Sequence, residues 1–196
     1  MIIEIEGTDG IGKTTQCRLL RGWFETRNQQ SMIVKDLEST QLGRQVKAIL
    51  TSDTPRTKEV ELFGFLCCKA HLFSEIIGPK VKEGTHIICD RGIGSFLSYF
   101  EVLGFNADFL KRTVASVLPE KFASTTLLLD GDVHEAIRRN VAKPAHSKFD
   151  NMGLEFFEKQ QRVYRRLATT NRWIVIGGND PIEKVHQSIT AAVVKL

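Results

Sequence analysis

Short apolar runs alternate with longer amphipathic segments along the chain. Residues 2–6 interleave isoleucines with glutamates and lead into a glycine-rich turn, after which apolar residues recur at helical spacing. The apolar runs over 31–34, 86–89, 125–129 and 173–176 are expected to be further strands. Strands that alternate with helices favour a parallel sheet covered by helices on both faces, so we predict the α/β fold class.

Helical spacing of apolar residues predicts the connecting segments. Helices are expected after residue 12, over 42–50, over 62–77, around 96–103 and 109–118, from Val133, over 154–167 and at the end of the chain. The helix over 62–77 should end near Pro79 or Gly84, because both residue types interrupt helices. Ligands bind beyond the carboxyl ends of the strands in such folds, so functional groups are expected there.

The periodicity is lost from Val141 to Lys148, and we expect a surface loop that forms a short lid over approximately 141–150. Basic residues without acidic neighbours gather in and before this segment: Arg138, Arg139, Lys143 and Lys148. A lid with this charge suits a phosphate-bearing ligand, and a solvated basic surface is the alternative.

Length and composition indicate one folded domain over 1–196. Of the 196 residues, 42% are hydrophobic and 26% are charged, as in ordinary globular proteins. The net charge of +4 requires neither a nucleic-acid polymer nor a membrane as partner, but it is compatible with a small polyanion. The sequence shows neither a membrane-spanning run nor the pattern of a signal peptide, so we expect a cytoplasmic protein.

The cysteines suggest no metal site and no disulfide framework. Cys17, Cys67, Cys68 and Cys89 form no Cys-x-x-Cys pair and lack matching histidines. We expect buried free thiols.

Residues 7–14, Gly-Thr-Asp-Gly-Ile-Gly-Lys-Thr, match the phosphate-binding motif G-x-x-x-x-G-K-[ST] and lie between a predicted strand and a predicted helix. Backbone N–H groups and the helix N-terminus bind phosphate oxygens in such a loop. Lys13 would bind the β- and γ-phosphates, and Thr14 would coordinate Mg²⁺. We therefore expect ATP and Mg²⁺, with the loop residues Gly7, Thr8, Asp9, Gly10, Ile11, Gly12, Lys13, Thr14 and Thr15 as binding residues.

A phosphate loop alone does not define the reaction. The Asn-Lys-x-Asp motif of GTPases and the Leu-Ser-Gly-Gly-Gln motif of ABC-type ATPases are absent from the sequence. Asp90 and Arg91 directly follow strand 86–89 and lie beside the phosphate loop if that strand neighbours the first. Asp90 would then hold Mg²⁺ or its waters, and Arg91 would clamp a phosphate. A surface ion pair is the alternative.

These features resemble the thymidylate kinase family of nucleoside monophosphate kinases, from the first strand to the last helix. The resemblance rests on the phosphate loop and on further motifs in the same order and spacing: Ser39-Thr40-Gln41-Leu42-Gly43, Phe65 four residues before Lys69, Asp90-Arg91 followed by Ser95 and Tyr99, and Lys148-Phe149-Asp150 before Phe156 and Tyr164.

The resemblance implies transfer of the γ-phosphoryl group of ATP to dTMP, giving dTDP and ADP, usually in a homodimer. It implies that Asp9 accepts a hydrogen bond from the 3′-hydroxyl of the acceptor, that Phe65 stacks on the pyrimidine and that Tyr99 disfavours a 2′-hydroxyl. The implied substrate-binding residues are Asp9, Phe65, Lys69, Arg91, Ser95 and Tyr99, and the implied catalytic residues are Lys13, Asp90, Arg91, Asp9 and Arg139.

Members of this family carry a catalytic arginine either in the phosphate loop or in the lid. Gly10 stands at the loop position, so the chain resembles the second type, with Arg139 and Lys143 as the expected lid cations and Lys143 on the ATP side. Closure of the lid would exclude water and favour transfer over ATP hydrolysis.

Three departures from the family's motifs lie on the acceptor side. Residues 35–40, Lys-Asp-Leu-Glu-Ser-Thr, stand where Arg-Glu-Pro-Gly-Gly-Thr is common, so Lys35 would replace an acceptor-phosphate arginine, and Glu38 would repel a phosphate if it pointed inward. Lys69 replaces a base-reading arginine. Gly92 replaces an aromatic residue and is expected to open the wall of the acceptor pocket.

Alternatives therefore stay open for the function and for single residues. The chain would be a kinase for another (deoxy)nucleoside monophosphate, or a nucleotide-binding module with a degenerate acceptor site. A bare nucleoside acceptor is disfavoured, because deoxynucleoside kinases commonly have Glu-Arg-Ser in place of residues 90–92. For Phe65 and Tyr99 the alternative is a place in the apolar core, and for Asp9 it is capping of the helix or loop.

Overall fold

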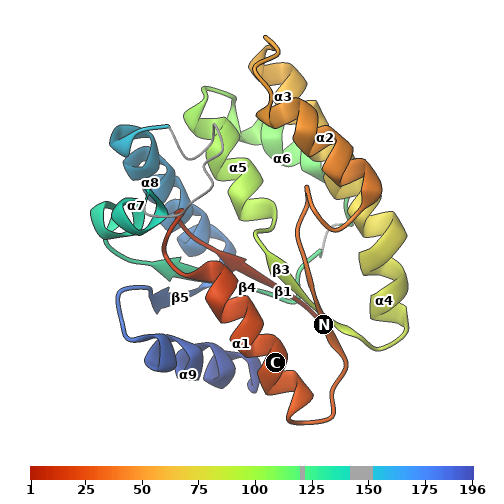
Figure 1. Cartoon of the computed structure of the whole chain (residues 1–196), viewed down its shortest axis with the longest axis vertical. Coiled ribbons are helices and arrows are strands. Elements are labelled where there is room, and N and C mark those ends of the chain that lie inside the picture. Colours follow the sequence, from red (N-terminus) through yellow and green to blue (C-terminus); the bar gives the residue numbers. More distant parts are fainter. Residues whose placement is uncertain (120–121, 142–151) are drawn as a thin grey trace.

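A computed structural model describes residues 1–119, 122–141 and 152–196. Its strands form one parallel sheet in the order β2-β3-β1-β4-β5 (Figure 1). They are β1 (Ile2–Glu6), β2 (Ser31–Val34), β3 (His86–Asp90), β4 (Thr125–Asp130) and β5 (Ile174–Gly177). Every predicted strand is present within one residue at either end, and the α/β fold class is confirmed.

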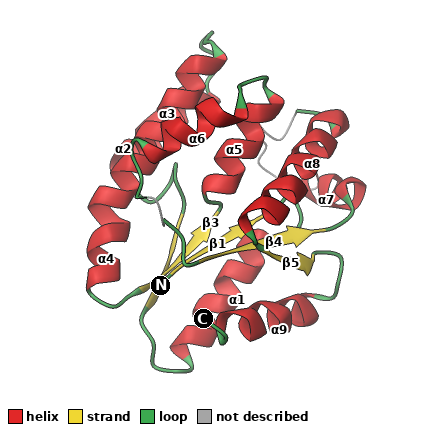
Figure 2. Ribbon diagram, turned by 180° about the vertical axis from the view of Figure 1, so that it is seen from behind, coloured by secondary structure: helices red, strands yellow, loops and turns green. Residues whose placement is uncertain are grey.

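Helices of the described residues cover both faces of the sheet. They are α1 (Lys13–Glu25), α2 (Gln41–Thr51), α3 (Lys58–Leu72), α4 (Gly78–Lys82), α5 (Ile93–Val102), α6 (Ala107–Ala115), α7 (Val133–Val141), α8 (Leu154–Asn171) and α9 (Ile182–Val193). Figure 2 shows α1 and α9 beneath one face, with α3, α4, α5 and α8 on the other. None of these helices is long and apolar enough to cross a membrane.

Two apolar layers hold the sheet between the helices. Ile3 and Ile5 of β1 pack with Leu20 and Phe24 of α1 on one side. On the other side the layer is formed by residues of β2, β3, α3, α5 and α6, including Ile87. All five residues of β1 are buried, the glutamates among them. A central parallel strand is covered on both faces, so its polar side chains have to find partners inside the protein.

The helix predicted over 62–77 does not end at Pro79. A π-helical turn, η1 (Phe73–Ile77), follows α3, and the chain continues into α4 with Pro79 in its first turn. Proline lacks an N–H group and is tolerated in a first turn, where that group has no helical partner. The segment ends before Gly84, whose φ of +85° suits glycine, so the second of the two predicted ends is confirmed.

The thiols differ in exposure. Cys17, Cys68 and Cys89 are buried and free, as expected, but Cys67 is exposed on α3. The prediction of a buried thiol is wrong for Cys67, because successive residues of a helix point about 100° apart and Cys67 lies outside the buried stripe that includes Leu66 and Cys68.

Candidate active site

The phosphate loop joins β1 to α1 at the carboxyl end of the central strand. Gly7, Gly10 and Gly12 have φ values of +138°, +84° and +107°, which glycine adopts without strain. Lys13 is the first residue of α1, and its ammonium donates hydrogen bonds to the carbonyls of Gly7 (2.7 Å) and Thr8 (2.8 Å). The side chain is buried, and burial lowers the pKa of Lys13 to about 8 against the opposing effect of nearby carboxylates. A phosphate in the loop would offer this ammonium charged oxygens in place of carbonyls.

Helix α7 packs directly on the phosphate loop. A side chain at Gly10 would overlap the backbone carbonyl of Ala136, which leaves no room there for an arginine. The same helix carries Arg139, whose guanidinium donates to Glu135 at 2.9 Å and is about half exposed. The lid, with Lys143 and Lys148-Phe149-Asp150, falls in 142–151, outside the described residues.

The predicted neighbourhood of β1 and β3 is confirmed, with Ile5 paired to Asp90 in the sheet. The hydroxyl of Thr14 donates to Oδ2 of Asp90 at 2.7 Å, so the two expected metal ligands are in contact. Their hydroxyl and carboxylate oxygens are the donors that Mg²⁺ prefers. The ammonium of Lys35 lies 3.1 Å from the same Oδ2, and Asp90 is buried. Lys35 is therefore directed toward the metal-ligand side of this cluster.

Arg91 joins the acceptor side to the phosphate loop. Its guanidinium forms an ion pair with Asp9 and lies 3.4 Å from the hydroxyl of Ser95. Arg91 has a φ of +80°, which is uncommon for a residue with a side chain. The Ser95 hydroxyl also donates to Glu6 at 2.5 Å and lies 2.9 Å from the Tyr164 hydroxyl. The structure thus brings Asp9, Arg91 and Ser95 together, with Ser95 bound to interior groups.

Phe65 and Tyr99 form an aromatic pair between α3 and α5. Their ring centroids are 6.4 Å apart, and each is partly buried against the core beneath. The Tyr99 hydroxyl donates to Glu61 at 3.4 Å, and burial together with this carboxylate raises the pKa of Tyr99. Glu61 in turn pairs with Arg56 at 3.1 Å. Phe65 and Tyr99, the predicted base and sugar contacts, are thus neighbours. The buried ion pair between Glu61 and Arg56 supports Tyr99 through its hydroxyl.

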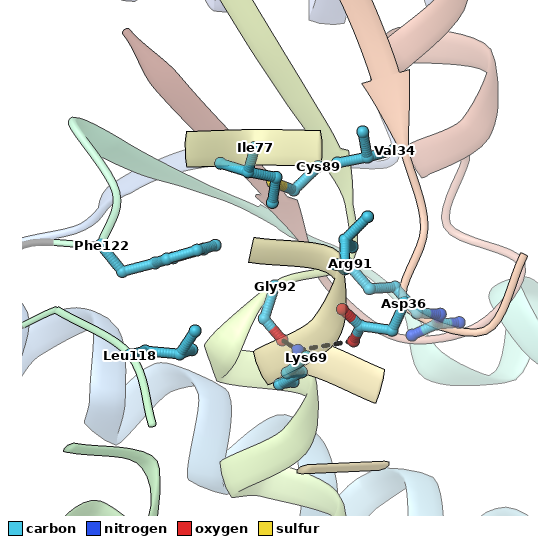
Figure 3. A pocket seen from close by; sticks show the side chains of 10 residues that line it. Val34, Asp36, Lys69, Ile77, Cys89, Arg91, Gly92, Leu118 and Phe122 are labelled. Carbon is cyan, nitrogen blue, oxygen red and sulfur yellow. Dashed lines mark hydrogen bonds and ion pairs between the residues drawn. The ribbon is translucent and has the colours of Figure 1, made fainter. Parts of the chain in front are cut away.

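Lys69 is turned into the protein. Its ammonium donates to Asp36 at 2.5 Å and to the carbonyl of Gly92 at 2.9 Å, and the residue is buried. Figure 3 shows these contacts beside a small cavity between β2, β3 and α3. Glu38 accepts a hydrogen bond from Lys47 at 2.7 Å, and its side chain is about half exposed. The two residues that raised doubt about the acceptor site therefore have partners within the protein.

The space that a side chain at position 92 would enter is filled. A Cβ atom at this position would overlap the carboxylate of Glu4, which accepts hydrogen bonds from the Ile93 N–H (2.7 Å) and the Thr126 hydroxyl (2.8 Å). The expectation that Gly92 opens the pocket wall is wrong at this point. Burial raises the pKa of Glu4 to about 7, and the neighbouring Glu6 adds to the shift.

Sequence reasoning missed the roles of Glu4 and Glu6. Alternating glutamates are typical of a strand with one solvated face, whereas both side chains here are buried. The available signal was their position in a strand that leads into a phosphate loop, since such a strand lies inside the sheet.

The parallel sheet, the phosphate loop at its switch point and the Asp-Arg pair on the adjacent strand define a P-loop nucleotide kinase fold. The family model for thymidylate kinase matches residues 5–189. The chain is 32% identical to a probable thymidylate kinase of Pyrococcus abyssi, over 97% of this chain and 94% of the relative. It is 28% identical to the thymidylate kinase of Kosmotoga olearia (96% and 93% covered) and 31% identical to that of Wolbachia pipientis (91% and 87% covered). This chain belongs to the thymidylate kinase family.

Proposed function

We propose that this chain transfers the γ-phosphoryl group of ATP to the 5′-phosphate of dTMP, forming dTDP and ADP. The observation that carries the proposal is the contact between Arg91, at the end of β3, and Asp9, inside the phosphate loop. It puts a phosphate-binding cation of the acceptor side next to the loop that holds the donor, as in-line transfer requires.

On the donor side, the backbone N–H groups of residues 7–15 hold the phosphates of ATP, and Lys13 moves from the loop carbonyls to the β- and γ-phosphates. Arg139, from the last turn of α7, and Lys143, from the predicted lid, would reach the transferring group. Because the guanidinium of Arg139 is half exposed at the end of α7, a modest rotation frees it from Glu135.

Thr14 and Asp90 would hold Mg²⁺, directly or through its waters, and their contact of 2.7 Å supports this assignment. The ion neutralises charge on the phosphates when it is bound.

On the acceptor side, Arg91 holds the 5′-phosphate and Asp9 the 3′-hydroxyl. Phe65 stacks on the base, and Tyr99 disfavours ribose; their neighbouring rings support both roles. Ser95 supports Arg91 at 3.4 Å. Because the proposed substrates are small nucleotides, we infer that the chain acts on nucleotides rather than on nucleic-acid polymers or membranes, and we propose the cytoplasm as its compartment.

Coupled release of ADP tests the proposal. ATP and Mg²⁺ are supplied with dTMP, dUMP, dCMP, dGMP, ribothymidine monophosphate or thymidine in turn, and Lys13→Ala is the inactive control. We expect dTMP to be the best acceptor and thymidine to be inert. A preference for another monophosphate would assign a different substrate, and ATP binding without acceptor-dependent turnover would indicate a binding module.

We also infer a homodimer. Ile49 of α2 and Val60 and Phe63 of α3 are more than half exposed, on two helices that lie side by side (Figure 1). An apolar surface of this kind suits a second copy of the chain. Sedimentation velocity of the wild type should give the mass of a dimer, and Phe63→Ser should shift the equilibrium toward the monomer.

A further inference from the structure

Three buried ionisable side chains meet at Gly92. Its N–H group donates to Glu6 at 2.9 Å, and its carbonyl accepts from the ammonium of Lys69 at 2.9 Å. The carboxylate of Glu4 lies against its Cα atom, in the space that a side chain would need. All three side chains are at most 5% exposed. Both backbone polar groups of Gly92 are thus bound by charged partners from β1 and α3.

The residue before Gly92 is Arg91, which has an uncommon backbone conformation. A φ of +80° in a residue with a side chain persists where the surrounding structure holds it in place. The N–H of Arg91 continues the sheet by donating to Ile5, and the chain then turns at Gly92 into α5. The direction of the Arg91 guanidinium therefore depends on how firmly Gly92 is held.

The ammonium of Lys69 is held by hydrogen bonds inside the protein. Asp36 and the Gly92 carbonyl take two of its three donors, and the ammonium faces the interior beside the cavity lined by Val34, Cys89 and Gly92 (Figure 3). A residue that reads a base edge has to present its donors to the ligand, whereas the donors of Lys69 are directed toward the turn.

We propose that Lys69 and Glu4 are positioning residues for the acceptor phosphate: they hold Gly92, and thereby aim Arg91, and Lys69 makes no contact with the base. The inference rests on the proposed function, since it assumes that Arg91 binds the 5′-phosphate of dTMP. In this proposal the α3 cation positions Arg91, whereas in a kinase that reads the base with a cation from α3 that cation contacts the base.

Binding of ligands with and without the 5′-phosphate tests the role of Lys69. In Lys69→Met the side chain keeps its length and loses its charge, so we expect dTMP affinity to fall about tenfold through a misaimed Arg91. Inhibition by thymidine, which lacks the phosphate, should stay within about twofold because the base contacts are unchanged. Equal losses for dTMP and thymidine would mean that Lys69 reads the base and would overturn the inference.

A double-mutant cycle with Arg91→Ala tests whether Lys69 acts through Arg91. If it does, Lys69→Met adds no further loss of dTMP affinity in the Arg91→Ala background. Additive losses would contradict the proposal. If the wild-type chain does not bind dTMP, the proposed function itself fails. If the wild type binds dTMP but the losses are additive, only the role of Lys69 is overturned, so the two failures are distinguishable.

The contact of Glu4 with Gly92 gives a second test that does not depend on Lys69. Gly92→Ala requires Glu4 to leave its two donors, so we expect lower dTMP affinity and a lower melting temperature. Glu4→Ala removes the overlapping carboxylate and should by itself lower dTMP affinity, so Gly92→Ala should cost less further affinity and less further melting temperature in the Glu4→Ala background than in the wild type. If Gly92→Ala lowers dTMP affinity and melting temperature equally in both backgrounds, Glu4 does not hold Gly92 and the proposal is overturned.

Discussion

The hydroxyl of Thr14 and the carboxylate of Asp90 are joined by a hydrogen bond of 2.7 Å, which links the first turn of α1 to the end of β3. The two residues are 76 positions apart in the sequence. Because β1 and β3 are neighbouring parallel strands, the phosphate loop and the buried carboxylate of Asp90 meet at the carboxyl ends of these strands. The account of catalysis depends on this meeting point.

Asp90→Asn should lower kcat by about 100-fold or more, since it removes a charge that would hold the metal against the phosphates. ATP affinity should change far less, because the loop N–H groups and Lys13 remain. Turnover and ATP binding are measured side by side. Asp108→Asn on α6, whose side chain is 78% exposed, is the matched control and should behave as wild type. An unchanged rate in Asp90→Asn would contradict the proposed metal role.

Lys35→Met should lower the Mg²⁺ concentration for half-maximal activity by about threefold, the scale of a partly exposed ion pair. The ammonium of Lys35 lies 3.1 Å from Oδ2 of Asp90 and competes with a cation there. Lys47→Met, which removes a cation bound to Glu38, is the control. If instead the KM for dTMP rises strongly and the Mg²⁺ requirement stays constant, Lys35 binds the acceptor phosphate.

Gly10→Ala should weaken ATP binding by about tenfold or more, because alanine is strained at a φ of +84° and its methyl group would overlap the Ala136 carbonyl. Gly22→Ala on α1 has open space around its Cβ atom and should raise stability by about 0.5–1 kcal/mol. Calorimetric titration with ATP and thermal melts measure both effects. Wild-type ATP affinity in Gly10→Ala would show that α7 does not press on the loop.

Glu4→Gln should change how stability depends on pH. The pKa of Glu4 rises in the fold to about 7 from an ordinary 4.5, so the folded state binds more protons than the unfolded state between these values. Wild-type stability is therefore lost as the pH rises through this range, by about 3 kcal/mol at most, and glutamine removes this loss. Melting curves at pH 5 and pH 8 should show that the stability of the variant, relative to that of the wild type, is higher at pH 8 than at pH 5. A constant difference would mean that Glu4 ionises freely.

The phosphate loop and the fold class could be predicted because their signals are local. Gly7 to Thr14 carries its chemistry within eight consecutive residues, and strand-helix alternation indicates a parallel sheet. The position of Asp90 could be predicted for a similar reason, since it ends an apolar strand at the carboxyl end, where ligands bind in such folds. Its contact with Thr14 needed only the prediction that two strands are neighbours.

The interior contacts of the acceptor site could not be predicted in this way. Whether Lys69 faces a ligand or Asp36 depends on how α3 packs over the end of β2, which no spacing in the sequence records. The loss of an aromatic residue at Gly92 suggested a hole, and Glu4, on a strand distant in sequence, fills it. Both the orientation of Lys69 and the packing at Gly92 depend on tertiary contacts between residues far apart in the sequence, where pairs of residues determine the outcome together.

The most direct test of the central claim is the product balance of the reaction. Wild-type chain is incubated with ATP, Mg²⁺ and dTMP, and nucleotides are separated and quantified over time. The account predicts that dTDP and ADP appear in equal amounts and that both are lost in Lys13→Ala. ADP without dTDP, or no turnover with dTMP while another monophosphate is consumed, would contradict it.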